Sequence, residues 1–157
     1  MASSTAKKVV VRRFERERIN GFVNPFSYLQ PDTVEVLKTD GNLALIPYAE
    51  VKSVAFVKDF DGDIEAGRIF LNRPKLDGLW VRTLFSDGEV QDGILPNNLL
   101  AWDPLGYSIT PPEPDGNCQK IFVPRVALRS VQILGVVGSP LRPKKKKPGA
   151  DIQPSLF

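Results

Sequence analysis

The sequence predicts an all-β protein in which one five-stranded unit occurs twice in tandem. Two segments, 46–57 (IPYAEVKSVAFV) and 123–134 (VPRVALRSVQIL), share one pattern: an apolar residue, Pro, three variable residues, an apolar residue, a basic residue, Ser-Val, any residue and two apolar residues. The remainder consists of short apolar or alternating runs between turn residues, which is typical of strands and not of helices. Together these observations predict five short strands in each half of the chain.

In the first half, turn residues separate the predicted strands. Gly21 allows the second run to bend, because a residue without Cβ tolerates a sharp fold of the sheet. Asp40-Gly41 is a hairpin signal. Pro47 interrupts the pattern, since proline fixes φ and carries no N–H, and the YAEV segment after it suits one helical turn. The predicted strands are 9–11, 19–29, 34–38, 43–46 and 51–57.

The second half follows the same plan. Residues 86–88 form a turn, Gly93 stands where the first half has Gly21, and Pro124 where it has Pro47. Residues 111–118 (PPEPDGNC) predict a polar loop. The predicted strands are 79–85, 89–95, 98–102, 119–123 and 129–136. A repeat this small buries only about 60% of its unfolded surface, which favours two repeats that share a core.

The predicted organisation has five parts: an N-terminal tail (1–8), a first repeat (9–57), a connector (58–78), a second repeat (79–139) and a basic C-terminal tail (140–157). The connector contains Phe60, Ile64 and Phe70, so we expect it to pack on one or both repeats. We expect both tails to be flexible, because their Ser-, Lys- and Pro-rich composition buries little apolar surface.

The basic character of the chain resides in its tails. The formal net charge is +3, yet residues 9–139 contain 14 basic and 17 acidic residues. The excess comes from Lys7, Lys8 and the segment RPKKKKP at 142–148. A run of like charges repels itself and usually acts as an interaction tail. We therefore assign partner binding to Arg142, Lys144, Lys145, Lys146 and Lys147, together with the apolar Leu156 and Phe157.

Two segments of the second repeat carry a family resemblance. VRTLFSDGEVQDGILPNNLLAW (81–102) contains an Asp-Gly turn followed by an apolar-Gly-apolar strand, and QKIFVPRVALRSVQIL (119–134) contains a strand, a sharp turn and a last strand. This order resembles the Sm-like small barrels of SH3-like architecture, which include bacterial Hfq. The first repeat is similar more loosely. The resemblance implies a tandem of two five-stranded Sm-like barrels, of an uncharacterised bacterial type.

The same resemblance implies contacts with nucleic acid. RNA-binding members of the family use Asp or Asn in the loop after the second strand and basic residues in the last turn. Asn97 and Asn98 stand near the first place, and Arg125 stands at the second. The first repeat has Tyr48 and Ala49 at its equivalent turn, neither of them basic.

Catalysis and metal binding find little support in the sequence. The chain contains no histidine and one cysteine, Cys118, which excludes Ser-His-Asp and Cys-His catalysis and intrachain disulfides. We therefore expect a protein that is not an enzyme and has no catalytic residues, cofactor or metal site. No apolar run of about 18 residues and no secretory signal occur, and we expect a cytoplasmic protein.

Two functions remain open at this stage. The leading hypothesis is a non-catalytic interaction or assembly subunit that binds protein partners in a larger complex through barrel surfaces and tails. The alternative is an Sm-like RNA- or DNA-binding protein. The mildly acidic body favours the first, and the resemblance favours the second. The basic tail also suits an anionic membrane surface, which would place the protein at the cytoplasmic face of a membrane.

Overall fold

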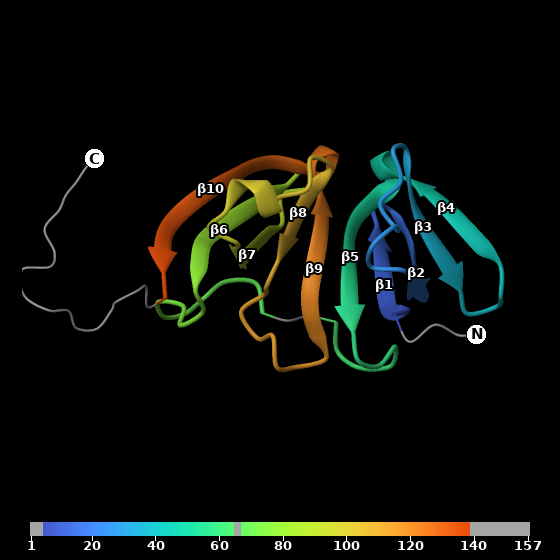
Figure 1. Ribbon diagram of the computed structural model, residues 1–157, viewed down its shortest axis with the longest axis horizontal. Coiled ribbons are helices and arrows are strands. Elements are labelled where there is room, and N and C mark those ends of the chain that lie inside the picture. The colour runs from blue at the N-terminus through green and yellow to red at the C-terminus, as the bar shows by residue number, and fades with distance from the viewer. Residues whose placement is uncertain (1–4, 65–66, 139–157) are drawn as a thin grey trace, which may run out of the picture.

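The computed structural model describes residues 5–64 and 67–138, and all of its longer elements are β-strands (Figure 1). The all-β prediction is confirmed, and every strand pair is antiparallel. The first half contains β1 (Lys7–Arg13), β2 (Arg16–Val23), β3 (Thr33–Lys38), β4 (Leu43–Pro47), the 3-10 turn η1 (Tyr48–Glu50) and β5 (Val51–Val57). The second half contains β6 (Gly78–Phe85), β7 (Val90–Leu95), η2 (Leu99–Ala101), β8 (Gly106–Ile109), β9 (Cys118–Pro124), η3 (Arg125–Ala127) and β10 (Leu128–Val137).

The two halves have the same strand order. In the first, the order is β5-β1-β2-β3-β4. In the second, β10-β6-β7 form one sheet and β8 pairs with β9, while paired hydrogen bonds between Ile94 and Thr110 join β7 to β8. The halves meet where β5 pairs with β9, which we call the seam. Among the described strands, β4 and β10 lie at opposite ends of this order, so neither sheet closes on itself.

The repeated phrase adopts the same local structure twice. Pro47 (φ −60°, ψ 142°) and Pro124 (φ −62°, ψ 142°) each end a strand and precede a three-residue 3-10 turn. A further strand follows each turn, as the shared pattern predicted. Proline suits this position because its fixed φ is compatible with extended backbone and its missing N–H ends the hydrogen-bonded ladder.

Gly21 and Gly93 occupy equivalent positions in β2 and β7. A Cβ at Gly21 would lie 2.5 Å from the Leu37 carbonyl oxygen on β3, and a Cβ at Gly93 would lie 2.7 Å from the Cβ of Ile109 on β8. Both glycines therefore allow the third strand of the repeat to approach the second closely. The sequence predicted that these glycines allow the second strand to bend, and the structure shows that they admit a neighbouring strand.

Two apolar cores lie on the two faces of the central strands, and both are shared between the repeats. Val10 and Ala55 of the first repeat enter a core made mostly by the second, whereas Phe122 of β9 enters the core of the first. All seven residues of β5 are buried, because the strand has a neighbour on each edge and a core on each face. The expectation of a shared core is confirmed.

The connector packs on both repeats, as expected, although part of it is exposed. The Phe60 ring lies edge-on to Phe22 at a centroid distance of 5.5 Å, and the Phe70 ring lies edge-on to Trp80 at 6.1 Å. Asp92 on β7 is fully buried and holds the connector through the backbone N–H of Phe70, at 3.2 Å. Leu71, by contrast, is 88% exposed.

The prediction of a strand over 98–102 was wrong. Residues 99–101 form η2 instead, because the side chain of Asn98 before it accepts a hydrogen bond from the backbone N–H of Leu100 and so stabilises a turn. The third strand of this repeat is β8, a short segment after Pro104. The second strand of the first repeat ends at Val23 and does not continue to residue 29.

In the described part of the chain, no helix is long and apolar enough to cross a membrane.

Candidate functional site

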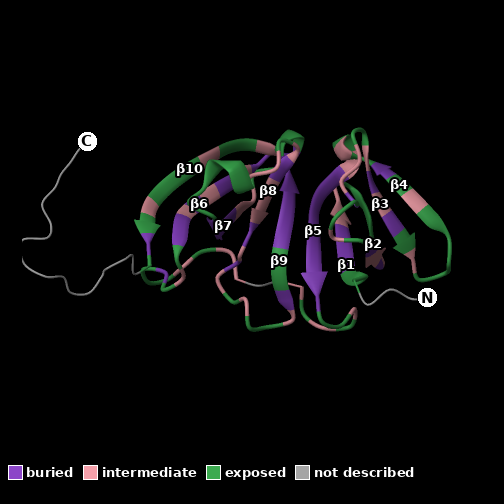
Figure 2. Cartoon of the chain, viewed as in Figure 1, coloured by how far each residue is buried: buried purple, intermediate pink, exposed green. Residues whose placement is uncertain are grey.

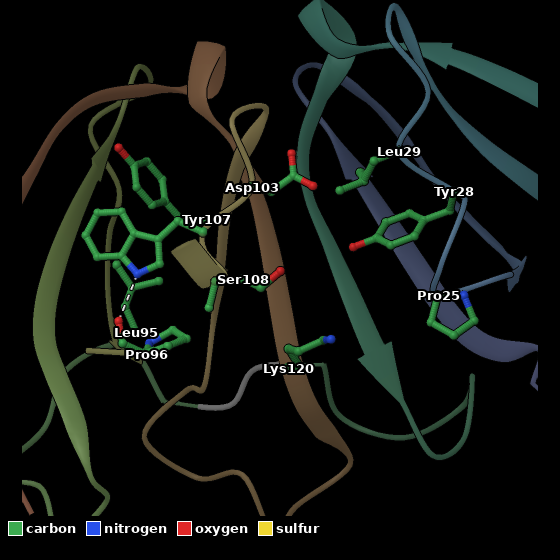
Figure 3. A pocket seen from close by; sticks show the side chains of 11 residues that line it. Pro25, Tyr28, Leu29, Leu95, Pro96, Asp103, Tyr107, Ser108 and Lys120 are labelled. Carbon is green, nitrogen blue, oxygen red and sulfur yellow. Dashed lines mark hydrogen bonds between the residues drawn. The ribbon is translucent and has the colours of Figure 1, made fainter. Parts of the chain in front are cut away.

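A cavity of about 180 Å³ lies beside the seam, between the β2–β3 loop of the first repeat and the β7–β8 loop of the second (Figure 3). We call it the seam cavity. Each repeat contributes the same loop, so the cavity exists only because the repeats are joined. Its lining consists of Pro25, Tyr28, Leu29, Leu95, Pro96, Ala101, Trp102, Asp103, Tyr107, Ser108 and Lys120.

The β2–β3 loop positions Tyr28 on one wall. The loop begins at Asn24. Its side-chain oxygen accepts a hydrogen bond from the backbone N–H of Phe26 at 2.9 Å, and its backbone carbonyl accepts one from the backbone N–H of Tyr28 at 3.0 Å. This turn directs the Tyr28 ring inward, where it packs edge-on against Phe56 at 5.6 Å and Phe122 at 6.1 Å. Because Phe56 lies on β5 and Phe122 on β9, Tyr28 packs across the seam.

The β7–β8 loop positions the opposite wall. The indole Nε1 of Trp102 donates to the Pro96 carbonyl at 2.8 Å, and its ring packs edge-on against Tyr107 at 5.9 Å. Asp103 accepts the backbone N–H of Leu105 on its carboxylate at 2.8 Å. This hydrogen bond fixes the carboxylate at the rim of the seam cavity, where Figure 3 shows it on the side nearest Leu29 and Tyr28.

The tyrosines near Asp103 stay neutral at physiological pH. Burial, and secondly the negative charge of Asp103, raise the pKa of Tyr28, although a hydrogen bond with Ser108 opposes the shift. Burial, followed by Asp103 and Asp32, raises the pKa of Tyr48 to about 12. Neutral phenols are hydrogen-bond donors. The Tyr48 hydroxyl already donates to the Gln30 carbonyl at 2.6 Å, so the phenol at this end of the cavity is that of Tyr28, which lines it together with the Asp103 carboxylate.

The other end of the cavity is cationic. Lys120 extends from β9 toward the side on which Pro25 lies (Figure 3), with its Nζ 4.7 Å from the centre of the Phe56 ring. Burial, and secondly the charge of Lys7, lower the pKa of Lys120. Lys120 and Pro25 also line an adjoining cavity of about 280 Å³, together with Lys7, Lys8, Phe56, Val57 and Gln119.

The arrangement is suited to binding. The seam cavity combines an amine, a carboxylate, two types of hydroxyl and aromatic walls, the mixture found in sites that orient a small ligand. None of the described residues that line it carries a thiol or an imidazole. Across the described chain, no group of three or more His, Cys, Asp or Glu side chains is placed to hold a metal ion.

The structure brings Asn98 and Arg125 into the same region, but neither side chain lines the cavity. Asn98 is engaged with Leu100, and Asn97 beside it is exposed. The Arg125 guanidinium lies 5.6 Å from the centre of the Tyr107 ring, a cation–π contact, while its backbone N–H donates to the Leu105 carbonyl at 2.9 Å. These interactions give both side chains structural roles.

The tail residues Arg142, Lys144, Lys145, Lys146, Lys147, Leu156 and Phe157 lie outside the described residues.

Exposed apolar side chains surround the loops. Phe26 is 87% exposed, and Leu99 and Leu100 are 71% and 95% exposed. Single exposed apolar residues are ordinary on protein surfaces, but these follow the two prolines that line the cavity, Pro25 and Pro96, within a few residues.

Sequence reasoning missed Tyr28, Asp103, Ser108 and Lys120. Tyr28, which the sequence placed in a strand over 19–29, lies in the β2–β3 loop and is 5% exposed, because this loop folds inward over the seam. The equivalence of the two loops was a usable signal: each follows the second strand of its repeat and begins with Asn-Pro or Pro-Asn, and each contains an aromatic residue further along.

Comparison with known families places the chain without assigning it an activity. Residues 5–135 match the model of a family of unknown function, DUF6982, and the chain belongs to that family. No curated protein and no solved structure matches it.

Proposed function

We propose that the protein is a non-catalytic assembly subunit, in which each half is an Sm-like small barrel of the open form and free sheet edges bind neighbouring subunits. The neighbour to which we commit is a second copy of the chain. The observation that carries the proposal is the match between the strands that form the seam and the strands that remain unpaired.

The seam already shows how one repeat binds the next. The fifth strand of the first repeat, β5, pairs with the fourth strand of the second, β9. The equivalent strands are β10, the fifth of the second repeat, and β4, the fourth of the first. Among the described residues, 5–64 and 67–138, each of these two strands has one edge without a partner strand, and the two edges lie at opposite ends of the picture (Figure 2). A β10 edge of one copy can therefore pair with a β4 edge of another as β5 pairs with β9.

The free edges carry apolar side chains at matching positions. In the seam, Val54 lies opposite Phe122 and Phe56 opposite Lys120. A shift of 77 residues, the distance from Pro47 to Pro124, converts these pairs to Val131 opposite Leu45 and Ile133 opposite Leu43. Leu43 and Leu45 are each 57% exposed and Ile133 is 59% exposed. Exposed apolar edge strands bind other strands unless they are protected.

The geometry of such a contact determines the type of assembly. The two edges are different surfaces, so the contact is heterologous and generates a closed ring or an open filament. The nucleic-acid alternative has weaker support, because Asn98 and Arg125 already have partners within the fold.

Sedimentation velocity across a concentration series tests the proposal. We expect the wild-type protein to form oligomers, and we expect Leu45→Lys on β4 and Ile133→Lys on β10 each to reduce it to monomers. Each variant retains one intact edge, so an equimolar mixture of the two should form heterodimers and nothing larger. Leu71→Lys, at an apolar residue of similar or greater exposure in the connector, is the matched control and should assemble like the wild type.

A wild-type chain that remains monomeric at high concentration would refute self-assembly. Assembly that survives both edge substitutions would place the interface elsewhere. Circular dichroism of both variants must show the wild-type β spectrum, since only then does monomer formation report on the edges.

A further inference from the structure

Two lysine side chains converge on the larger cavity beside the seam. The strand registers align Val9 of β1, Phe56 of β5 and Lys120 of β9 in one row. Lys7 precedes Val9 by two residues, so it lies on the same face of the sheet as Phe56 and Lys120. Both lysines line the cavity of about 280 Å³. After burial, the positive charge of Lys7 is the second cause of the lowered pKa of Lys120.

This pair of charges is uncompensated. Within the described part of the chain, neither Lys7 nor Lys120 forms an ion pair, and the Lys120 ammonium lies over the face of the Phe56 ring. Lys8 differs, although it lines the same cavity. Its Nζ donates to the Lys58 carbonyl at 3.5 Å and lies 5.6 Å from the centre of the Phe60 ring. Both lysine residues are exposed overall, yet burial against the cavity wall is the largest cause of the lowered pKa of Lys120. Two cations that repel each other across a cavity favour an anion between them.

We propose that the cavity between Lys7 and Lys120 is a binding site for a phosphate group. Lysine amines act as point charges and bind phosphate without the fork geometry that carboxylate recognition by arginine uses. The Gln119 side chain in the lining adds an amide donor. A dianionic phosphate neutralises both lysines, which a single carboxylate does not. The site is independent of the edge-pairing function, since neither lysine lies on β4 or β10.

Isothermal titration calorimetry of the full chain with inorganic pyrophosphate tests the site. We expect one pyrophosphate per chain. Lys7→Gln and Lys120→Met should each weaken binding at least about tenfold, because a hydrogen bond to a charged group contributes roughly 1.5–3 kcal/mol. Methionine at position 120 preserves the apolar contact with Phe56. Lys58→Gln, which removes one charge from a nearby lysine that does not line the cavity and donates to the Asp115 carbonyl, is the matched control and should change affinity by less than about threefold.

Proton uptake on binding distinguishes a site at Lys120 from a general attraction between the anion and the positive charges of the protein. Because burial and Lys7 lower the pKa of Lys120, an anion that stabilises its ammonium raises that pKa. Binding at alkaline pH should therefore take up protons, and the observed heat should depend on the ionisation heat of the buffer. Lys120→Met should abolish this dependence.

Two further experiments test whether the basic tail contributes to binding and whether the phosphate belongs to a lipid headgroup. Replacement of Lys144 to Lys147 by alanine should leave pyrophosphate binding intact. Vesicles of phosphatidylcholine with phosphatidic acid distinguish a lipid headgroup from a soluble phosphate, because only a headgroup site makes vesicle binding sensitive to Lys7→Gln. Absence of binding at millimolar pyrophosphate, or equal binding by the wild type and both site variants, would overturn the proposal.

Discussion

Replacement of Lys52 by methionine should loosen the contact between the repeats. Lys52 lies on β5 of the first repeat, is 7% exposed, and bonds to two carboxylates on the β6–β7 turn of the second. Its Nζ lies 2.8 Å from Asp87 Oδ2, contacts Glu89 Oε1, and lies 5.0 Å from the centre of the Phe85 ring. Met preserves the aliphatic stem, so the substitution removes mainly the charge and its hydrogen bonds.

The expected loss in the free energy of unfolding depends on how far the two carboxylates that bind Lys52 are buried. A hydrogen bond to a charged group contributes roughly 1.5–3 kcal/mol. Removal of one member of a fully buried ion pair costs about 3–5 kcal/mol. Here the carboxylates are 39% and 35% exposed, so water replaces part of what they lose. We therefore expect a loss of about 2 kcal/mol in the free energy of unfolding, which shifts the urea midpoint by about 1 M.

The loss should depend on pH. Burial would raise the pKa of Asp87, but hydrogen bonds from Lys52 and from the Glu89 backbone lower it overall. The hydrogen bond from Lys52 is the largest contribution to the lowered pKa of Glu89. A lowered folded-state pKa contributes stability that is complete above the unfolded value, about 4. That stability is lost as the pH falls through the folded value, so the difference between wild type and variant should shrink below about pH 4.

Urea unfolding, followed by the fluorescence of Trp80 and Trp102 between pH 7 and pH 3, measures both effects. The control is Lys38→Met, because Lys38 pairs with Asp40 at 3.8 Å on the surface and such pairs contribute about 0–1 kcal/mol. A Lys52→Met protein as stable as the Lys38→Met protein, or an unchanged difference at pH 3, would refute the reasoning.

Two further substitutions test the fold around the site. Gly21→Ala should destabilise the protein by about 1–3 kcal/mol, because the new Cβ would lie 2.5 Å from the Leu37 carbonyl oxygen; thermal unfolding measures this, and Gly116→Ala, with its nearest atom at 3.5 Å, should be nearly neutral. Asp92→Asn should release the connector, because Asp92 binds both Nε and Nη2 of Arg82, at 2.7 and 3.0 Å, and the Phe70 N–H at 3.2 Å. Limited proteolysis between β5 and β6 should be faster in that variant than in the wild type, and equal rates would contradict the anchoring role.

Local steric signals in the sequence predicted local structure well. Pro47 and Pro124 end strands because they lack an N–H, and Gly21 permits close approach because it lacks a Cβ; both effects depend on the residue itself. The segment 98–102 was misjudged because its apolar residues Leu99 and Leu100 resemble a strand, while the deciding interaction is the Asn98 side chain on the Leu100 N–H. That choice between turn and strand is not visible in apolar periodicity.

The site depends on long-range pairing, which local patterns do not encode. Tyr28 and Asp103 are 75 positions apart in the sequence and come together only because β5 pairs with β9. The equivalence of the repeats did predict that two similar loops exist. It did not predict that the repeats associate along this pair of strands, and the role of Lys120 follows from that association alone.

The residues at equivalent positions of the two repeats differ between the seam within the chain, where we propose the phosphate site, and the proposed contact between two copies. Val9 and Val81 are equivalent, because each lies opposite the corresponding residue of the fifth strand, Phe56 or Ile133. The counterpart of Lys7 is therefore Leu79, and the 77-residue shift makes Leu43 the counterpart of Lys120.

A seam between two copies would thus present leucines where the seam within the chain presents lysines. Leucines favour association through apolar burial, whereas the lysines leave a charged cavity open to a ligand. It follows that an assembled form should bind one phosphate per chain, at the internal seam, and not a second at each new contact. If calorimetry gave two phosphates per chain in the oligomer and one in the Leu45→Lys monomer, the contact between copies would also bind phosphate, and this prediction would be wrong.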